Sequence, residues 1–396
     1  MTFSVLLNTD CGLRGSQELE FGLQDLHRAL QANAGLTDWL EFDGSRLAGI
    51  ELDQISALDS EQLLVVLNPA LIVSDNLMRE LTEVLRQNPQ ACVVPGDPRC
   101  TEDGWQIDYA SRGGFERYVA RREHLSRQQQ GNAAQAWVYL VKRQVLLTLL
   151  LESATLSWQA IAQRMPGGCL VAQRAFVHSY ADYQKSERLE IVRMVPAGVQ
   201  KLVDVGGGEG GFLRAFQRNR ASEVLLVEPN MQSAAVARQL GTAVLAERFE
   251  SLDSIMLGGT DCISFLDVLE HFENPLAALR HAHKLLPAGG RVILSVPNVG
   301  HWSVVQDLLH GRFDYLPLGI LCCTHLRFFT ERSLRQLLAD ANFLVQTWHN
   351  QPSPLPAELA QALGIVAGGT HPWNLTSLGT DSFHVVACKS PAHAYD

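Results

Sequence analysis

The sequence predicts an α/β protein of two domains, in which a smaller domain precedes one built on a mostly parallel sheet. Three observations predict this fold. The chain has 396 residues, more than one domain ordinarily holds. From residue 201 onward, apolar runs of strand length alternate with amphipathic stretches of helix length, as in parallel sheets covered by helices on both faces. The first strand–helix junction of that series is rich in glycine, as it is where such sheets bind a ligand.

The second half of the chain shows the alternation most regularly. Its strands are expected at residues 201–205, 223–228, 262–267 and 291–297, with amphipathic helices between them. A further helix is expected at 331–342. The last two strands, 343–348 and 382–388, are joined without an obvious full-length helix, so we expect an antiparallel edge there.

The first half also begins with an α/β pattern. Strands are expected at residues 3–9, 62–68 and 91–95, and helices at 16–31 and 75–88. The apolar run 136–151 is expected to form one buried or amphipathic helix, because two basic residues make it too polar to span a membrane. The polar stretch 126–135 is expected to be a loop. A helix near 181–193 is expected to connect to the second domain, with the boundary after residue 190.

Composition and charge exclude several classes of protein. The chain has 32 basic and 42 acidic residues, a net charge of −10, which would repel a polyanion, so no nucleic-acid partner is predicted. No signal peptide or membrane span is evident. The eight cysteines show no spacing typical of a zinc site, and we predict no metal. Scattered cysteines of this kind are typical of a reducing compartment, so a cytoplasmic protein is expected.

The glycine-rich junction is DVGGGEGG, residues 204–211. Its glycines satisfy the GxGxxG pattern, so a dinucleotide such as NAD has to be considered. Asp204 favours a different ligand, because a carboxylate there attracts an ammonium group and repels a pyrophosphate. Glu228 ends the next strand, where a carboxylate can accept hydrogen bonds from both ribose hydroxyls.

The run from Asp204 to about Trp348 resembles a class I S-adenosylmethionine-dependent methyltransferase of the ubiquinone-biosynthesis type. The motifs that carry the resemblance are DVGGGEGG, LLVEPN, LDVLEH and AGGRVILSVPN. The resemblance implies a Rossmann-like domain with seven strands, residues 191–396, and S-adenosylmethionine as the cofactor. It also implies that the cofactor is bound by Asp204, Gly206, Gly208, Gly210, Glu228, Pro229, Glu247, Arg248, Leu266 and Asp267. Among these, Glu228 would hold the ribose, Asp204 and the glycine backbone the methionine moiety, and Glu247 with Arg248 the adenine.

Three histidines are candidate general bases for a hydroxyl acceptor, because the pKa of histidine lies near neutrality. His271 follows the third strong strand, and His301 and His325 lie in the segment 298–330 that is expected to cover the acceptor. Each of the three could instead make only a structural hydrogen bond.

The first domain, residues 1–190, resembles part of a family 2 glycosyltransferase in its segments 62–97 and 168–192. In that family an acid-bearing motif after the strand binds metal and nucleotide-sugar phosphate. Ala70 occupies the place of the expected Asp, and alanine cannot bind a metal. We therefore expect a degenerate, GT-A-like α/β domain, kept as a scaffold or for recognition of the acceptor.

Together these features predict a methyltransferase that acts on a sugar or glycan intermediate, most simply at oxygen. THLRFFT, residues 324–330, followed by a helix, is typical of relatives encoded beside sugar-transfer enzymes. Three alternatives stay open: a methyltransferase for small natural products, a bifunctional glycosyltransferase–methyltransferase, and a non-catalytic assembly protein. The expected partners are a small-molecule or glycan acceptor, and a second copy or another protein bound through the N-terminal domain.

Overall fold

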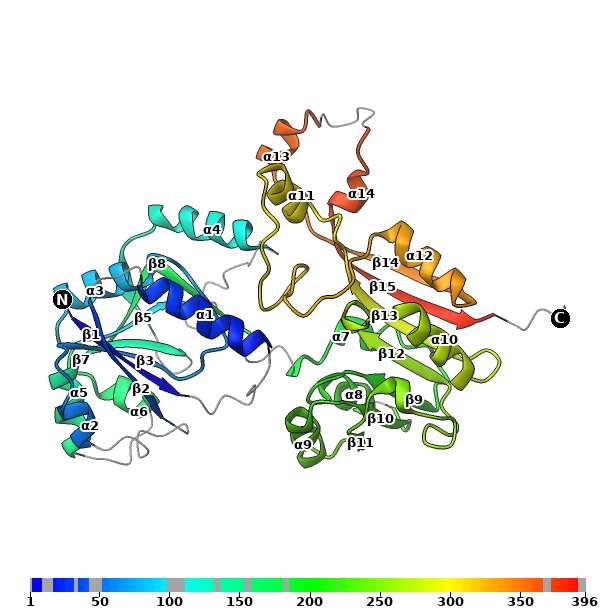
Figure 1. Cartoon of the computed structure of the whole chain (residues 1–396), viewed down its shortest axis with the longest axis horizontal. Coiled ribbons are helices and arrows are strands. Elements are labelled where there is room, and N and C mark those ends of the chain that lie inside the picture. Colours follow the sequence, from blue (N-terminus) through cyan, green and yellow to red (C-terminus); the bar gives the residue numbers. More distant parts are fainter. Residues whose placement is uncertain are drawn as a thin grey trace. The chain divides into compact units, whose positions relative to one another are not determined.

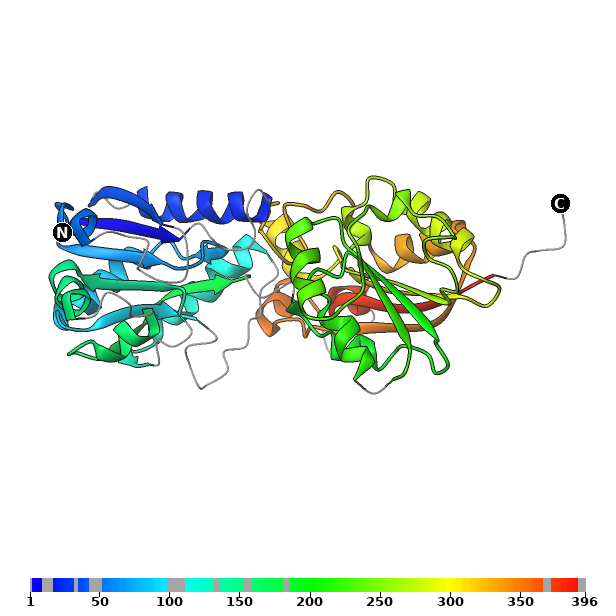
Figure 2. The same cartoon turned by 90° about the horizontal axis from the view of Figure 1, so that it is seen from below.

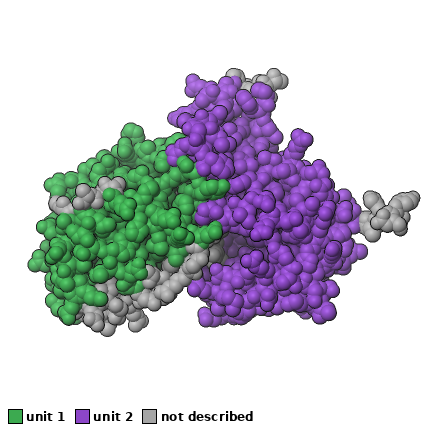
Figure 3. All heavy atoms as spheres, viewed as in Figure 1, with its two compact units in different colours: residues 1–181, 314–318 green, residues 182–313, 319–396 purple. Residues whose placement is uncertain are grey.

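The computed structural model describes residues 2–8, 17–31, 35–42, 52–97, 111–131, 136–152, 158–180, 185–218, 220–365 and 372–390. The chain forms two compact units (Figure 3). Unit 1 comprises Met1–Ala181 and Asp314–Leu318, and unit 2 comprises Asp182–Phe313 and Gly319–Asp396. The division after residue 181 is close to the one expected after 190. No pattern in the sequence predicted that a short segment from the second half would belong to unit 1.

Unit 1 contains one mixed sheet with helices on both faces (Figure 1). Its strands are β1 (Phe3–Asn8), β2 (Leu36–Phe42), β3 (Gln62–Val66), β4 (Leu71–Val73), β5 (Cys92–Gly96), β6 (Gln128–Gln130), β7 (Val138–Lys142) and β8 (Cys169–Ser179). They are ordered β2-β1-β3-β7-β5-β8-β4, and β6 pairs with β8. Its helices are α1 (Gln17–Gln31), α2 (Leu52–Ser56), α3 (Leu77–Gln87), α4 (Arg112–Arg121), α5 (Arg143–Glu152) and α6 (Trp158–Arg164).

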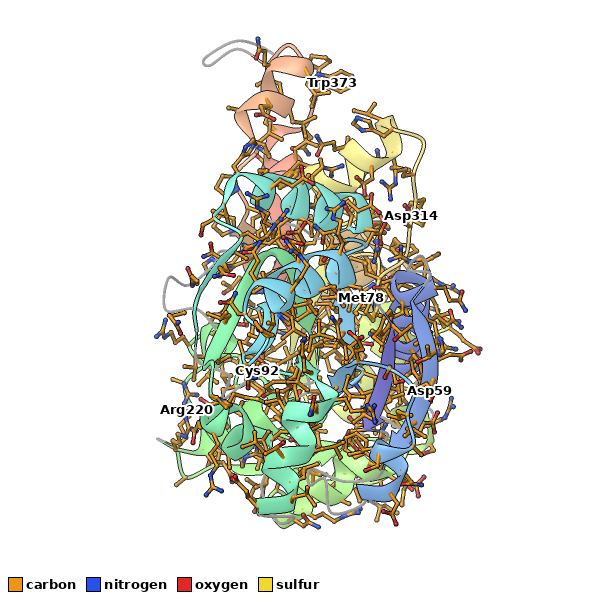
Figure 4. The ribbon with its side chains drawn as sticks, turned by 90° about the vertical axis from the view of Figure 1, so that its left-hand side faces the viewer. Asp59, Met78, Cys92, Arg220, Asp314 and Trp373 are labelled. Carbon is orange, nitrogen blue, oxygen red and sulfur yellow. The ribbon has the colours of Figure 1, made fainter. Side chains whose placement is uncertain are left out.

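The strands of unit 1 are buried on both sides because successive residues face opposite ways. Val5 and Leu7 of β1 pack on the face covered by α1 and α3, and α1 lies along the sheet (Figure 2). Leu6 packs on the other face, with α5 and α6. Met78 on α3 and Cys92 on β5, both labelled in Figure 4, are buried in these two cores.

Two expectations for unit 1 were wrong. The run 136–151 is not one helix, because β7 occupies its first part and α5 its second. Val138–Val141 are β-branched, aromatic and apolar residues that pair antiparallel with β3 and are buried on both faces, so tertiary pairing decides their conformation. The stretch 126–135 was expected to be a loop, but β6 lies within it and pairs with β8. Residues 132–135 of that stretch lie outside the described part of the chain.

Unit 2 contains the predicted seven-stranded sheet, ordered β11-β10-β9-β12-β13-β15-β14. Its strands are β9 (Lys201–Val205), β10 (Glu223–Val227), β11 (Val244–Leu245), β12 (Cys262–Leu266), β13 (Arg291–Pro297), β14 (Phe343–Pro352) and β15 (Thr380–Lys389). The first five are parallel, and β15 is antiparallel to both β13 and β14, which confirms the expected antiparallel edge.

Helices cover both faces of this sheet. They are α7 (Leu189–Val192), α8 (Gly211–Gln217), α9 (Met231–Gln239), α10 (Pro275–Leu285), α11 (Trp302–Leu309), α12 (Glu331–Asp340), α13 (Ala357–Ala362) and α14 (Leu375–Leu378). Leu202 faces the core under α7 and α8, whereas Val203 faces the core under α10 and α12. The long connecting helix expected near 181–193 is reduced to α7 in the described residues. In the part of the chain that the structure describes, every helix is too short or too polar to cross a bilayer.

Candidate active site

The glycine loop follows β9 directly and leads into α8. Gly206, Gly208 and Gly210 have φ values of 68°, 56° and 76°, in the left-handed region that side chains disfavour. A Cβ added to Gly206 would lie 2.9 Å from the Cγ2 of Val268, so the loop also packs too closely for a larger residue. The sequence thus has glycine where both backbone conformation and close approach require it.

Asp204 lies under this loop at the end of β9. Its Oδ1 accepts a hydrogen bond of 2.6 Å from the Ser264 hydroxyl on the neighbouring strand. Its Oδ2 is buried and has no hydrogen-bond partner among the described residues, and a Cβ on Gly207 would collide with it. Burial raises the pKa of Asp204 to about 7, although the Ser264 hydrogen bond and the charge of Arg188 oppose the rise. An uncompensated carboxylate at this point favours a cationic ligand group.

Glu228 follows β10 and is hydrogen-bonded to the same loop. Its Oε2 accepts the backbone N–H of Gly208 at 2.9 Å, and its Oε1 accepts the N–H of Asn230 at 2.8 Å. Burial raises the pKa of Glu228, and these two bonds oppose the rise. Because a carboxylate oxygen can accept two hydrogen bonds, each oxygen keeps capacity for a ligand hydroxyl.

Asp267 follows β12 and is held by an ion pair that the sequence did not reveal. The Arg188 guanidinium donates to Asp267 Oδ2 and, at 2.9 Å, to the Ser295 hydroxyl, which itself donates to Asp267 Oδ1 at 2.6 Å. Burial would raise the pKa of Asp267, but Arg188 and the Ser295 hydrogen bond outweigh it and lower the pKa. Asp267 and Arg188 both have positive φ, at 55° and 44°, a backbone cost typical of functional sites.

The remaining predicted cofactor residues lie at the ends of the same strands. Pro229 follows Glu228 and is exposed. Glu247 and Arg248 come just after β11 and are exposed, and Leu266 is the last residue of β12. Since β11, β10, β9 and β12 are adjacent and parallel, their carboxyl ends meet at one edge of the sheet. The predicted cofactor residues therefore lie in the last residues of strands that end at this edge or in the loops that follow them.

Two of the candidate histidines are brought together beside this edge. His271 ends a 3₁₀ turn (Leu269–His271), and its ring lies 4.8 Å, centroid to centroid, from the ring of His325. Burial lowers the pKa of His325 to about 4, and the charge of His271 adds to this effect. His271 is exposed.

His301 has a different environment. It is the N-cap of α11, where its Nδ1 accepts the Ser303 N–H at 3.2 Å and its Nε2 lies 2.8 Å from the Ser353 hydroxyl. Burial lowers its pKa to about 4. Nδ1 thus caps the helix and Nε2 is hydrogen-bonded to Ser353, so both ring nitrogens have structural partners, the structural alternative considered for this residue.

Glu270 was missed by the sequence reasoning. It directly precedes His271 and is fully buried, with its Oε1 3.8 Å from the Nε2 of His325. Neither carboxylate oxygen has a hydrogen-bond partner among the described residues. Burial raises its pKa well above the ordinary value, and the charge of Asp267 adds to the rise. The signal that could have found it is LEH, an acid beside a candidate histidine just after a buried strand.

The chemistry of the edge fits a ligand with an ammonium group and a ribose. The unpartnered Asp204 oxygen can take the ammonium group, and Glu228 can accept ribose hydroxyls. The glycine turn leaves no side chain between these acids and the ligand.

Comparison with known proteins adds independent information. The family model described as a methyltransferase domain matches residues 172–347. The ubiquinone biosynthesis O-methyltransferase of Azotobacter vinelandii is 32% identical over 185 residues, covering 38% of this chain and 79% of that protein. Its counterpart in Pseudomonas aeruginosa (strain LESB58) is 32% identical over 132 residues, covering 29% of this chain. Here the match spans only 56% of the relative's length.

A solved structure that matches part of the chain is magnesium protoporphyrin IX methyltransferase from Synechocystis PCC 6803, crystallised with bound S-adenosylmethionine. It is 16% identical, with a TM-score of 0.33, and the likeness covers 52% of this chain and 80% of that one.

Proposed function

Because the chain belongs to the S-adenosylmethionine-dependent methyltransferases, we propose that it transfers a methyl group to an oxygen atom of a sugar or glycan intermediate. The observation that carries the proposal is the glycine loop held between Asp204 and Glu228. When bound, S-adenosylmethionine supplies a methyl group already activated by its sulfonium. The protein's own task is to hold the cofactor, align the acceptor and exclude water.

The geometry at the sheet edge supports a proposed set of cofactor residues. In this proposal Asp204 pairs with the ammonium group, and Glu228 accepts the ribose hydroxyls while it braces the glycine loop. Glu247 and Arg248 contact the adenine from the end of β11. Leu266 and Asp267 line the cofactor from β12, with Arg188 fixing the carboxylate of Asp267.

Oxygen is the proposed acceptor atom because the relatives named above are O-methyltransferases. A hydroxyl must lose its proton as the new bond to carbon forms. We assign this step to the pair His271 and His325, which lie next to the cofactor edge. Their rings meet at an interplanar angle of 82°.

The sugar as acceptor is inferred from unit 1. We propose that it is a degenerate glycosyltransferase-like domain that recognises the acceptor. Ala70, which stands where that family has an acid, is fully buried, and its N–H donates to the Asn68 Oδ1 at 2.8 Å. A small-molecule acceptor, such as a precursor of a quinone, is the second candidate, because the relatives' names place them in ubiquinone biosynthesis.

The experiment is a comparison of cell extracts incubated with methyl-labelled S-adenosylmethionine and either the wild-type chain or a Glu228→Ala variant. Mass spectrometry of glycan precursors and of lipid-extracted quinones then locates the label. Label in a glycan precursor only with the wild-type chain supports the proposal. Label in a quinone or phenol supports the second candidate, and label on nitrogen or in nucleic acid contradicts both.

A further inference from the structure

A short piece of the second half of the chain belongs to unit 1. Residues 314–318, here called the strap, are part of unit 1, whereas Phe313 before them and Gly319 after them are part of unit 2 (Figure 3). The strap begins at Asp314, which is labelled in Figure 4. Gly311 and Gly319 have φ values of 73° and 81°, left-handed values at which glycine lets the chain turn. The chain therefore turns shortly before the strap and directly after it.

Leu316 holds the strap in unit 1. Its side chain is 1% exposed and belongs to a hydrophobic cluster of unit 1. The cluster is rich in aromatic residues, and the rings of Phe115 and Tyr118 on α4 lie 6.0 and 4.9 Å from the ring of Phe176 on β8. Its other buried members in the described part of the chain lie within residues 19–180. Leu316 therefore ties a segment that is distant in the sequence into the core of unit 1.

The residues that follow the strap lead to His325 through a series of hydrogen-bonded turns. The N–H of Cys322 donates to the carbonyl of Gly319 at 3.1 Å, and the N–H of His325 donates to the carbonyl of Cys322 at 3.0 Å. The Nδ1 of His325 lies 2.9 Å from the carbonyl oxygen of Ile320. A carbonyl oxygen only accepts, so in the neutral ring Nδ1 carries the proton and Nε2 carries the lone pair that a base needs. The turns therefore set both the place and the tautomer of His325.

We propose that Leu316 is a positioning residue, which fixes the strap in unit 1 and thereby holds His325 where it can remove the proton of the acceptor. This role rests on the proposed function, because proton removal is the step assigned there to the histidine pair. Ile320, whose carbonyl orients the His325 ring, comes two residues after the end of the strap, so a strap that moves takes this carbonyl with it. Unit 1 then serves methyl transfer by holding a segment that leads directly to the reacting groups.

The test uses three variants of the full chain. Leu316→Asp places a charge in the apolar cluster and should release the strap. Leu316→Met keeps an apolar side chain of similar volume and should behave like the wild type. Leu309→Asp is the matched control, because Leu309 is 64% exposed at the end of α11, in the chain that leads to the strap. Circular dichroism verifies that each variant is folded.

Hydrogen–deuterium exchange, measured by mass spectrometry, reports the strap directly. In Leu316→Asp the amides of residues 310–325 should exchange roughly 10- to 150-fold faster than in the wild type, the change expected when a buried leucine becomes exposed. The amides of residues 201–217, around the glycine loop, should exchange at the wild-type rate. Equal exchange of residues 310–325 in Leu316→Asp and the wild type would show that Leu316 does not hold the strap.

The pKa of His325 is a second measurement that needs no methyl transfer. Burial lowers this pKa to about 4, the charge of His271 adds to the effect, and the charge of Asp267 opposes it. Nuclear magnetic resonance of ring-labelled histidine gives the pKa, and His325→Gln assigns the signal. In Leu316→Asp the pKa should rise toward the ordinary value of about 6.5, whereas Leu316→Met and Leu309→Asp should keep it low. An unchanged pKa in Leu316→Asp would show that His325 is held without the strap.

Transfer of labelled methyl groups into cell extract tests the consequence for the reaction. Leu316→Asp should lower the rate at saturating extract by up to about a hundredfold, the lower end of what loss of a general base costs, and should keep its affinity for S-adenosylhomocysteine. If Leu316→Asp transfers label as fast as the wild type, the positioning role is wrong and the proposed function stands. If the wild type labels no acceptor, the proposed function is wrong, and hydrogen exchange and the pKa of His325 still decide whether Leu316 positions that histidine.

Discussion

The Glu228 carboxylate accepts a hydrogen bond of 2.9 Å from the backbone N–H of Gly208, so the acid after β10 is joined directly to the glycine loop after β9. Glu228 therefore has two roles. It offers its remaining acceptor capacity to the ribose, and it fixes the loop that the cofactor contacts. Loss of Glu228 should weaken binding of the cofactor through both effects.

Glu228→Ala is the first prediction. A hydrogen bond to a charged group contributes about 1.5–3 kcal/mol, so we expect S-adenosylmethionine to bind roughly 10- to 150-fold more weakly. Titration calorimetry measures the change, and circular dichroism verifies the fold. Glu223→Ala, at an exposed glutamate at the opposite end of β10, is the control and should bind normally. Equal affinity of the wild type and Glu228→Ala for S-adenosylmethionine would show that Glu228 does not bind the cofactor.

Gly206→Val is the second prediction. The new side chain would meet Val268 and would also have to adopt a φ of 68°, so cofactor binding should be lost. Gly289→Val is a matched control, because Gly289 has a similar φ of 75° but no atom within 4 Å of an added Cβ. It adds the same backbone strain away from the loop. If the two variants bind the cofactor equally well, the glycine loop is not the binding site.

The third prediction concerns pH and Asp204. Its raised pKa of about 7 means that the carboxyl group is largely neutral at pH 6 and ionises as the pH rises. Only the ionised form attracts the cofactor's ammonium group, so affinity should rise roughly fivefold from pH 6 to pH 7. Calorimetry at both values measures it. Asp204→Asn should lose most of the rise, and a wild-type affinity that falls over this range would contradict the assignment.

The fourth prediction is that His271→Ala lowers turnover while the affinity for S-adenosylmethionine is kept. Loss of proton removal typically costs about a hundredfold to ten-thousandfold in rate. The remaining rate should increase with pH, because the acceptor then loses its proton to solvent. His349→Ala, at an exposed histidine on β14, should have no effect. Full turnover of His271→Ala at neutral pH would mean that proximity alone suffices, or that the acceptor is an amine.

The fifth prediction concerns unit 1. Because Ala70 offers no metal ligand, the full chain should neither hydrolyse nor transfer nucleotide sugars when Mn²⁺ or Mg²⁺ is added. Release of nucleoside diphosphate is the measurement, with an active glycosyltransferase as positive control. Metal-stimulated release by this chain would show that the domain is active.

The sequence predicted much of unit 2 because its pattern is local. Strands such as Lys201–Val205 are rich in β-branched and other apolar residues, their helices have one apolar face, and the acids at the strand ends follow by position alone. The prediction from sequence failed at residues 136–151, where pairing of β7 with β3 overrides a helix-like composition. Contacts between residues far apart in the sequence could not be predicted either. Nothing near Arg188 indicates that it binds Asp267, and only the fold brings His325 to Glu270.

We propose that the carboxyl edge of β9, β10 and β12 binds S-adenosylmethionine rather than a dinucleotide. Titration calorimetry of the full chain with S-adenosylhomocysteine and, separately, with NADH tests it most directly. We expect one S-adenosylhomocysteine to bind per chain, in competition with S-adenosylmethionine, and no heat of binding with NADH. Binding of NADH that is lost in Gly206→Val, with no binding of S-adenosylhomocysteine, would contradict it.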